Sequence, residues 1–126
     1  MLKKGFKDLL AEANAVIESM DVTSAAALVG DGDTVFVDVR EMHERQTGFI
    51  PGSVHAPRGF LEFIADPAGP MHEPALGEDK RIVLYRGSGA RSALAAKTLK
   101  DMGFARVVSL VGGMAAWKAA DRDIAF

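Results

Sequence analysis

One short stretch, YRGSGARS at residues 85–92, has the composition of an anion-binding turn. It follows an apolar run typical of a strand and precedes an alanine-rich segment typical of a helix. Glycines let successive backbone N–H groups converge, and the positive end of a helix dipole then lies behind them. Such a turn suits a small oxyanion such as sulfate, thiosulfate, phosphate or arsenate. The candidate binding residues are Arg86, Gly87, Ser88, Gly89, Ala90 and Arg91.

Glycine content alone does not decide what this turn does, because most strand-to-helix turns carry glycine only to reverse direction. The Walker pattern GxxxxGK[ST] is absent, and the chain has no cysteine, which excludes cysteine catalysis and thiolate metal sites. The three histidines lack HxH or HxxxH spacing, so we expect no metal site. A triad of Ser88, a histidine and Asp38 is a weak alternative, because the GxSxG elbow is only half matched.

Charged residues after an earlier apolar run form the second candidate feature. Asp38, Arg40 and Glu44 are spaced so that they could form a salt-bridge group, which Arg91 could join. For Asp38 and Glu44 we prefer the structural interpretation, a charge network that supports the turn. Arg58 stands before a long loop, and we expect it to face the mouth of the site as a substrate-recognition residue.

The elements that must position these residues follow from three apolar runs. The β-branched and apolar runs at 34–39, 81–85 and 107–110 predict strands, and the periodicity of 92–102 predicts a helix. Strands that alternate with helices favour a parallel α/β sheet. Ligands bind at the carboxyl ends of the strands in such sheets. We therefore expect the three strand ends to converge on one pocket with 86–91 at its floor.

The beginning of the chain shows a different pattern. Apolar residues recur at three- and four-residue spacing over residues 2–20, which predicts an amphipathic helix. We expect this helix (1–20) to pack on a single main domain (21–126), with Val22 in a short edge strand. A membrane-binding or partner-binding helix is the less favoured alternative, because acidic and basic residues both line its polar face.

Composition limits the classes of partner. The chain has 126 residues, 48% of them hydrophobic, which suffices for one domain with a sizeable core. A net charge of −2 gives no reason to expect nucleic acid. No apolar run approaches about 18 residues, and charges interrupt the first 13 residues, so neither a membrane span nor a signal peptide is expected. We therefore expect a cytoplasmic protein without a membrane partner; its oligomeric state stays open.

Several motifs together resemble the rhodanese-like (single-domain sulfurtransferase) family over roughly residues 22–120. An Asp-x-Arg strand end followed by a Gly-x-Ile-Pro-Gly motif resembles the family's first signature. A strand, glycine-rich loop and helix resemble its active-site segment, and a Leu-x-Gly-Gly-x-x-x-Trp run resembles its last strand. These three stretches are FVDVREMHERQTGFIPGSVHAP (36–57), IVLYRGSGARSALAAKTLKDMGF (82–104) and VVSLVGGMAAW (107–117).

The resemblance implies a single α/β domain with a five-stranded parallel sheet and helices on both faces, plus the extra N-terminal helix. It also implies transfer of sulfane sulfur from thiosulfate or a related donor, through a cysteine persulfide, to a thiophile such as cyanide or a protein thiol. No metal or organic cofactor is implied. The six-residue loop fits sulfurtransferases, whereas members that resemble phosphatases or arsenate reductases carry one residue more.

The family's nucleophilic cysteine falls on Arg86. A guanidinium stays protonated and has no lone pair with which to attack sulfur. We therefore predict that this chain does not turn over thiosulfate. Three explanations remain: a naturally silent member that binds an anion or a protein partner, a substitution introduced into an active enzyme, or a misplaced register.

Overall fold

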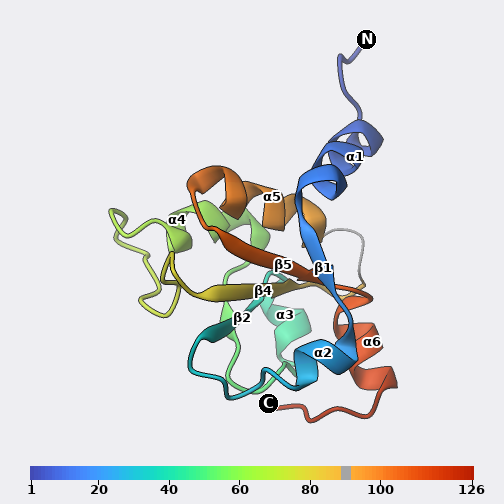
Figure 1. Ribbon diagram of the computed structural model, residues 1–126, viewed down its shortest axis with the longest axis vertical. Helices are drawn as coiled ribbons and strands as arrows, with labels where there is room; N and C mark the ends of the chain where they lie inside the picture. Colours follow the sequence, from blue (N-terminus) through green and yellow to red (C-terminus); the bar gives the residue numbers. More distant parts are fainter. Residues whose placement is uncertain (89–91) are drawn as a thin grey trace.

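A five-stranded parallel sheet forms the centre of the computed structural model, which describes residues 1–88 and 92–126 (Figure 1). The strand order is β1-β5-β4-β2-β3. The strands are β1 (Glu18–Met20), β2 (Thr34–Asp38), β3 (Val54–His55), β4 (Arg81–Tyr85) and β5 (Arg106–Leu110). The helices are α1 (Phe6–Val16), α2 (Val22–Ala26), α3 (Met42–Arg45), α4 (Leu61–Ala65) after the 3-10 turn η1 (Arg58–Phe60), α5 (Ser92–Met102) and α6 (Gly113–Ala119). The predicted fold class is confirmed.

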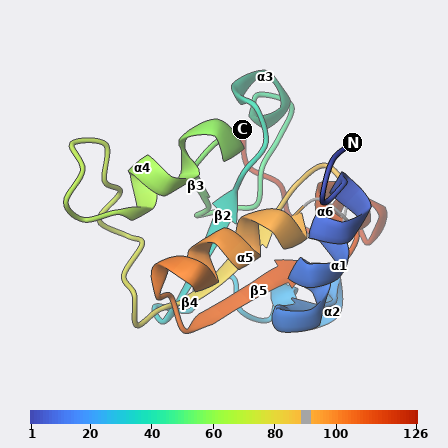
Figure 2. The ribbon, with the colours of Figure 1, turned by 90° about the horizontal axis from the view of Figure 1, so that it is seen from above.

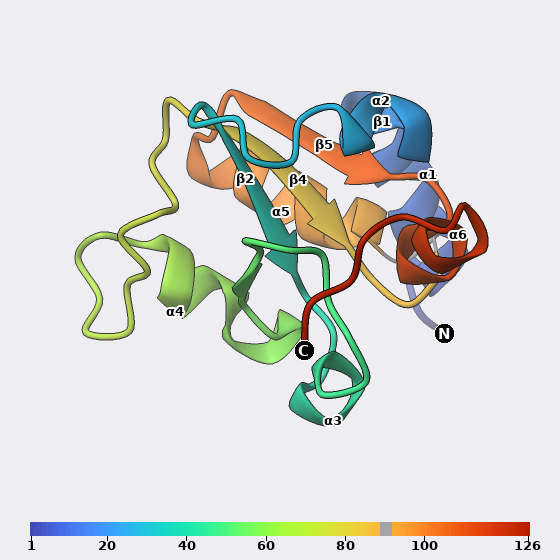
Figure 3. The same ribbon diagram turned by 90° about the horizontal axis from the view of Figure 1, so that it is seen from below.

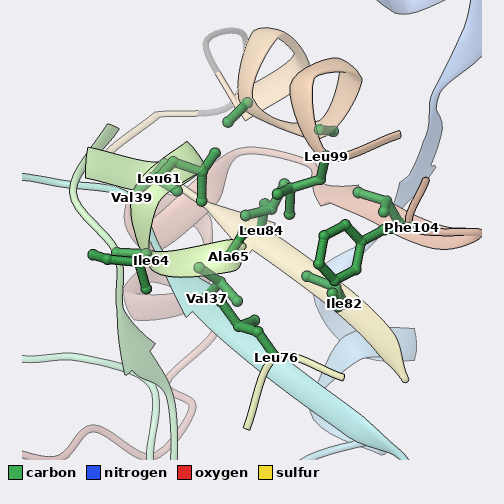
Figure 4. Packing of buried hydrophobic residues seen from close by; sticks show 14 residues of the cluster. Val37, Val39, Leu61, Ile64, Ala65, Leu76, Ile82, Leu84, Leu99 and Phe104 are labelled. Carbon is green, nitrogen blue, oxygen red and sulfur yellow. The ribbon is translucent and has the colours of Figure 1, made fainter. Parts of the chain in front are cut away.

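The first core lies between the sheet and the helices α4 and α5. Successive strand residues point to opposite faces, so Val37, Ile82 and Leu84 share this face. Leu61 and Ile64 of α4 and Leu99 of α5 close over them (Figure 4). Seen from above, α5 lies across β4 and β5 with α1 beside it (Figure 2).

The second core lies on the opposite face of the sheet, under α2 and α6. Its buried members are Ala25, Phe36, Ile50, Val83, Tyr85, Val108, Leu110, Met114 and Trp117. The rings of Phe36 and Trp117 meet edge to face with 6.1 Å between their centroids. Helices therefore cover both faces of the sheet, as the family resemblance implied.

The N-terminal segment differs from its prediction. The helix ends at Val16, and Glu18–Met20 instead form β1, which pairs in parallel with β5. Val22, expected in an edge strand, begins α2, whose cap is the Asp21 side chain that accepts from the Ser24 amide at 2.7 Å. For residues 18–20, pairing with the open edge of β5 outweighs the helical periodicity of the segment. A sequence pattern cannot show which strand has an open edge. In the described part of the chain no helix is both long and apolar enough to cross a bilayer.

The carboxyl ends of β2, β4 and β5 lie at one edge of the sheet because all three strands are parallel (Figure 3). The chain continues from β2 toward α3 and from β5 into α6. The first residues after β4 contact both of these elements: Arg86 and Gly87 accept hydrogen bonds from α6, and Gly87 lies beside Glu44 of α3. This arrangement places the candidate residues.

Candidate functional site

Arg86 is the first residue after β4, and the described part of the loop runs from Arg86 to Ser88. The remaining predicted loop residues, Gly89, Ala90 and Arg91, lie outside the described residues. Helix α5 follows at Ser92. The site is therefore built from the start of the loop and from the elements on either side of it.

Helix α6 orients the start of the loop. The amide of Met114 donates to the carbonyl of Arg86 at 2.7 Å, and the amide of Ala115 donates to the carbonyl of Gly87 at 3.0 Å. In a trans peptide the C=O and the following N–H point in opposite directions. The N–H groups of Gly87 and Ser88 therefore point away from α6, and neither donates to any residue in 1–88 or 92–126.

This close approach depends on a glycine. Gly113 has φ +57, and a Cβ at this position would collide with the carbonyl oxygen of Arg86 and lie 3.0 Å from its carbonyl carbon. The paired glycines at 112 and 113, which the sequence marked only as a turn, bring the α6 amides into contact with the loop. The glycine pair is thus part of the site.

Arg86 gives the loop a fixed positive charge. The residue is half-buried, and its guanidinium makes no ion pair or hydrogen bond with any residue that the structure describes. Guanidinium groups offer donors only and match oxyanions in geometry. The described residues also contain no group of three His, Asp or Glu that could hold a metal ion.

The end of β2 holds a fully buried carboxylate, Asp38, that two arginines neutralise. Arg40 binds it through its backbone N–H at 3.0 Å, through Nε at 2.9 Å and through Nη2 at 2.8 Å. Arg45 adds a contact from Nη1 at 3.2 Å. This fork geometry is the strong form of an arginine–carboxylate pair. The predicted pairing of Asp38 with Arg40 is present. The third member of the group is Arg45, not Glu44.

Tyr85 ties this network to the loop, since it is the last residue of β4. Its hydroxyl donates a hydrogen bond to Asp38 Oδ2 at 3.2 Å. The same hydroxyl accepts a hydrogen bond from the Ile50 amide at 3.2 Å. Ser53 Oγ lies 3.0 Å from the same hydroxyl and accepts from Arg45 at 3.1 Å. One proton assignment satisfies every bond: Ser53 donates to Tyr85, and Tyr85 donates to Asp38.

The titration of the network supports a structural role. Burial alone would raise the pKa of Asp38, but the hydrogen bonds and charge of Arg40, with the charge of Arg45, outweigh it and hold that pKa below its ordinary value. Burial and the Asp38 charge raise the pKa of Tyr85. Asp38 is therefore ionised and Tyr85 neutral at pH 7, and neither offers a proton to a ligand.

Glu44 and Arg58 make contacts outside the Asp38 network. Glu44 Oε1 accepts from the Glu41 amide at 3.2 Å, and Glu44 Oε2 lies 3.5 Å from the position that a Cβ on residue 87 would take. The guanidinium of Arg58 binds Glu62 at 3.0 Å and the Thr98 hydroxyl of α5 at 3.1 Å. Glu44 thus borders the loop. Arg45, which the sequence reasoning missed, has no local signal beyond its place on the turn after β2.

Comparison with known proteins agrees with this geometry. The model of the rhodanese-like domain matches residues 21–120. The chain belongs to the rhodanese-like family.

Relatives of this rhodanese-like domain include proteins named for sulfur chemistry. YrkF of Bacillus subtilis, named as a candidate sulfur carrier protein, is 33% identical over 116 residues, which are 92% of this chain and 58% of YrkF. The chain thus spans just over half of that relative. A sulfurtransferase of Allochromatium vinosum is 30% identical, over 81% of this chain and 89% of the relative.

A solved structure resembles this rhodanese-like domain over almost its whole length. It is a protein of unknown function from Rhodopseudomonas palustris, described as a possible tyrosine phosphatase. The two share 44% identity with a TM-score of 0.90, over 99% of this chain and 97% of the other.

Proposed function

We propose that this rhodanese-like domain binds a small oxyanion at the start of its loop and does not transfer sulfur. The observation that carries the proposal is the orientation of two peptides. Because α6 takes the carbonyls of Arg86 and Gly87, the N–H groups of Gly87 and Ser88 point away from α6. The guanidinium of Arg86, at the start of the same loop, has no hydrogen-bond or ion-pair partner among the described residues. Converging N–H donors and a cation are what an oxyanion needs.

Sulfur transfer needs a thiolate that attacks the sulfane sulfur and carries it as a persulfide. The chain has no cysteine, and Arg86 offers only donors. Ser88 is exposed and has no base as a hydrogen-bond partner among the described residues, so its hydroxyl has no route to an alkoxide. A phosphatase activity, suggested by the description of the Rhodopseudomonas relative, is disfavoured by the six-residue loop and by the same missing thiol.

The catalytic half of the proposal is tested by thiocyanate formation from thiosulfate and cyanide. We expect the chain to stay at background and Arg86→Cys to rise above it, with Arg86→Ala as the control that removes the arginine without supplying a thiol. Turnover by the unchanged chain would overturn the proposal. Silence of all three proteins would mean that the loop has drifted from catalysis by more than the loss of its cysteine.

The binding half is tested by thermal unfolding in anion series at constant ionic strength. A ligand that binds only the folded state stabilises it by RT ln(1 + [L]/Kd), which is about 2.7 kcal/mol at a hundredfold excess over Kd. We expect at least one of sulfate and phosphate to raise the Tm above chloride, and Arg86→Ala to reduce that shift. Identical Tm values in all three salts would refute binding.

A further inference from the structure

The sheet has an uncovered edge at β1, its outermost strand beside β5. Glu18 and Ser19 are exposed, and Met20 is half-buried. Helix α1 packs beside α5 over one face of the sheet (Figure 2), and Val22 and Ala25 of α2 join the core on the other face. The two helices that flank β1 in the chain therefore cover faces and leave the edge open. An open strand edge is a template for pairing with another strand.

The backbone groups of Ser19 point toward this open side. The amide of Val111 donates to the carbonyl of Met20, so the N–H and C=O of Met20 point toward β5. Backbone groups of successive residues in a strand point to alternate sides, and those of Ser19 therefore point away from β5. No residue within 1–88 or 92–126 forms a hydrogen bond with either of them.

The residues that flank β1 continue the open edge. Ile17 (φ −99, ψ 159) and Asp21 (φ −80, ψ 166) are extended and each lies two residues from Ser19, so they share its orientation. The Ile17 amide donates to Ala13, and the Asp21 carbonyl accepts from Ala25. The Ile17 carbonyl and the Asp21 amide have no partner in the part of the chain that the structure describes. The edge thus offers one further acceptor and one further donor.

This row of groups is complementary to itself in the antiparallel orientation. A two-fold axis at Ser19 lets the two copies of this residue exchange both of their N–H···O bonds. The same register sets the Asp21 amide of one copy opposite the Ile17 carbonyl of the other. It sets Glu18 opposite Met20, so no like charges face each other across the pair. Any extended strand could fill the edge, but this match of donors, acceptors and charges favours a second copy.

The opposite edge of the sheet is less suited to pairing. Strand β3 has only two residues, Val54–His55, and Pro57, which lacks an N–H, follows shortly after them. Short strands and nearby prolines are common means of blunting an edge. Residues 17–21 include neither a proline nor a lysine.

We propose that two copies of this chain pair antiparallel through β1 and join their five-stranded sheets into one continuous sheet. Such a contact is isologous and closes on itself, which gives a dimer rather than a filament. Because the strands of the two copies run in opposite directions, their carboxyl edges face opposite ways. The two loops after β4 therefore lie at opposite edges of the joined sheet, and the proposal does not depend on anion binding.

Sedimentation of the full chain tests the dimer. Concentrations from about 10 μM to about 1 mM are needed, because interfaces below about 1,200 Å² are weak. Ser19→Lys and Ser19→Glu each place like charges together at the axis, and we expect each to weaken self-association about fivefold or more. An equal mixture of the two variants is expected to restore the dimer. Ala68→Lys, on the loop after α4 at the far side of the sheet, is the control and should associate like the unchanged chain (Figure 1).

Amide hydrogen exchange gives a second measurement on the unchanged chain. We expect the Ser19 amide to exchange more slowly as the protein concentration rises, because dimerisation covers it. The Met20 amide points toward β5 in every copy, so its exchange should not depend on concentration. This measurement needs no substitution and so decides the proposal even if a variant at residue 19 fails to fold.

Three results would overturn the proposal. One is a chain that stays monomeric up to about 1 mM, with Ser19 exchange independent of concentration. Another is a dimer that neither substitution at residue 19 weakens, since it would use a different surface. The third is a pair of weakened variants that do not associate when mixed, because a two-fold axis at Ser19 requires the opposite charges to meet.

Discussion

At the scale of single residues, helix α6 sets the direction of the backbone N–H groups at the start of the loop. The carbonyls of Arg86 and Gly87 are both occupied by amides of α6, and this alone turns the next two N–H groups outward. The arrangement needs a residue without a side chain at position 113, where φ is +57 and the backbone of Arg86 is in contact. A backbone contact, rather than a side chain of the loop, thus sets the N–H orientation on which the proposed anion binding rests.

Replacing Gly113 by alanine tests this contact. The Cβ would collide with the carbonyl of Arg86 in a conformation that costs an L-residue about 1–2 kcal/mol, so we expect a loss of about 2–3 kcal/mol of stability and weaker anion binding. Gly52→Ala is the matched control, since Gly52 has φ +79 and no atom within 4 Å of its Cβ position. Urea unfolding should show a smaller loss for Gly52→Ala; equal losses would contradict a special role for the contact.

Asp38→Asn tests the buried charge network. The folded-state pKa of Asp38 is lowered, so its contribution is complete above the unfolded pKa of about 3.9 and is lost as pH falls through the folded value. We expect a loss of about 3 kcal/mol at pH 7, because Arg40 and Arg45 lose their counter-charge. The difference in unfolding free energy between Asp38→Asn and the unchanged chain should decrease below about pH 4. A difference that does not change with pH would contradict the lowered pKa of Asp38. Asp123→Asn, at an exposed carboxylate, is the control.

At the scale of elements, the turn after β2 is held from two directions. Arg45 binds Asp38 on one side, and its guanidinium lies 3.9 Å from the centroid of the Phe49 ring on the other. Phe49 exchanges two backbone hydrogen bonds of 2.9 Å with Ala125, so the last residues of the chain cross from α6 to this turn. The C-terminal segment thereby restrains the residues that support the loop.

Ile124→Ala tests this restraint. The Ile124 side chain packs against Gly48, so its truncation removes contacts worth about 1–2 kcal/mol and loosens the bridge between Phe49 and Ala125. We expect the Phe49 amide to exchange with solvent about tenfold faster, in line with a local loss of about 1.4 kcal/mol. Arg122→Ala, in the same segment, is the control. Unchanged exchange at Phe49 would show that the tail does not restrain the turn.

At the scale of the whole molecule, the N-terminal segment contributes a strand as well as a helix. Of the residues of α1 only Ala13 is buried, while Phe6 remains 67% exposed. Strand β1, by contrast, covers the edge of β5, and the amide of Val111 donates to the carbonyl of Met20 at 2.9 Å. The sheet therefore depends on residues 18–20 more than on the helix before them.

Two truncations separate these contributions. A chain that begins at Ile17 loses α1 but keeps β1, and we expect it to fold with a small loss of stability. A chain that begins at Asp21 also loses β1 and uncovers the edge of β5, so we expect a further loss of about 2 kcal/mol or more. The midpoints of urea unfolding measure both, and equal midpoints would place the domain boundary after Met20 instead.

Much of the site was readable from local patterns. The strand at Arg81–Tyr85, the helix that starts at Ser92 and the glycine-rich turn between them carry their signals in neighbouring residues. The pairing of Asp38 with Arg40 is likewise local, since the two are two residues apart on one strand end. Arg45, Ser53 and Ile50 join that network only through the return of the chain, so no spacing pattern marked them.

The sequence by itself determined the fold class, the family motifs and the absence of a thiol at the start of the loop, because these depend on residue types and short-range periodicity. Only the tertiary structure decided that residues 18–20 form a strand, that α6 orients the loop and that Glu44 borders Gly87. Each of these depends on which strands are neighbours in the sheet. The strand order arises because both apolar faces of the sheet must be buried at once, and no local segment of the sequence encodes that requirement.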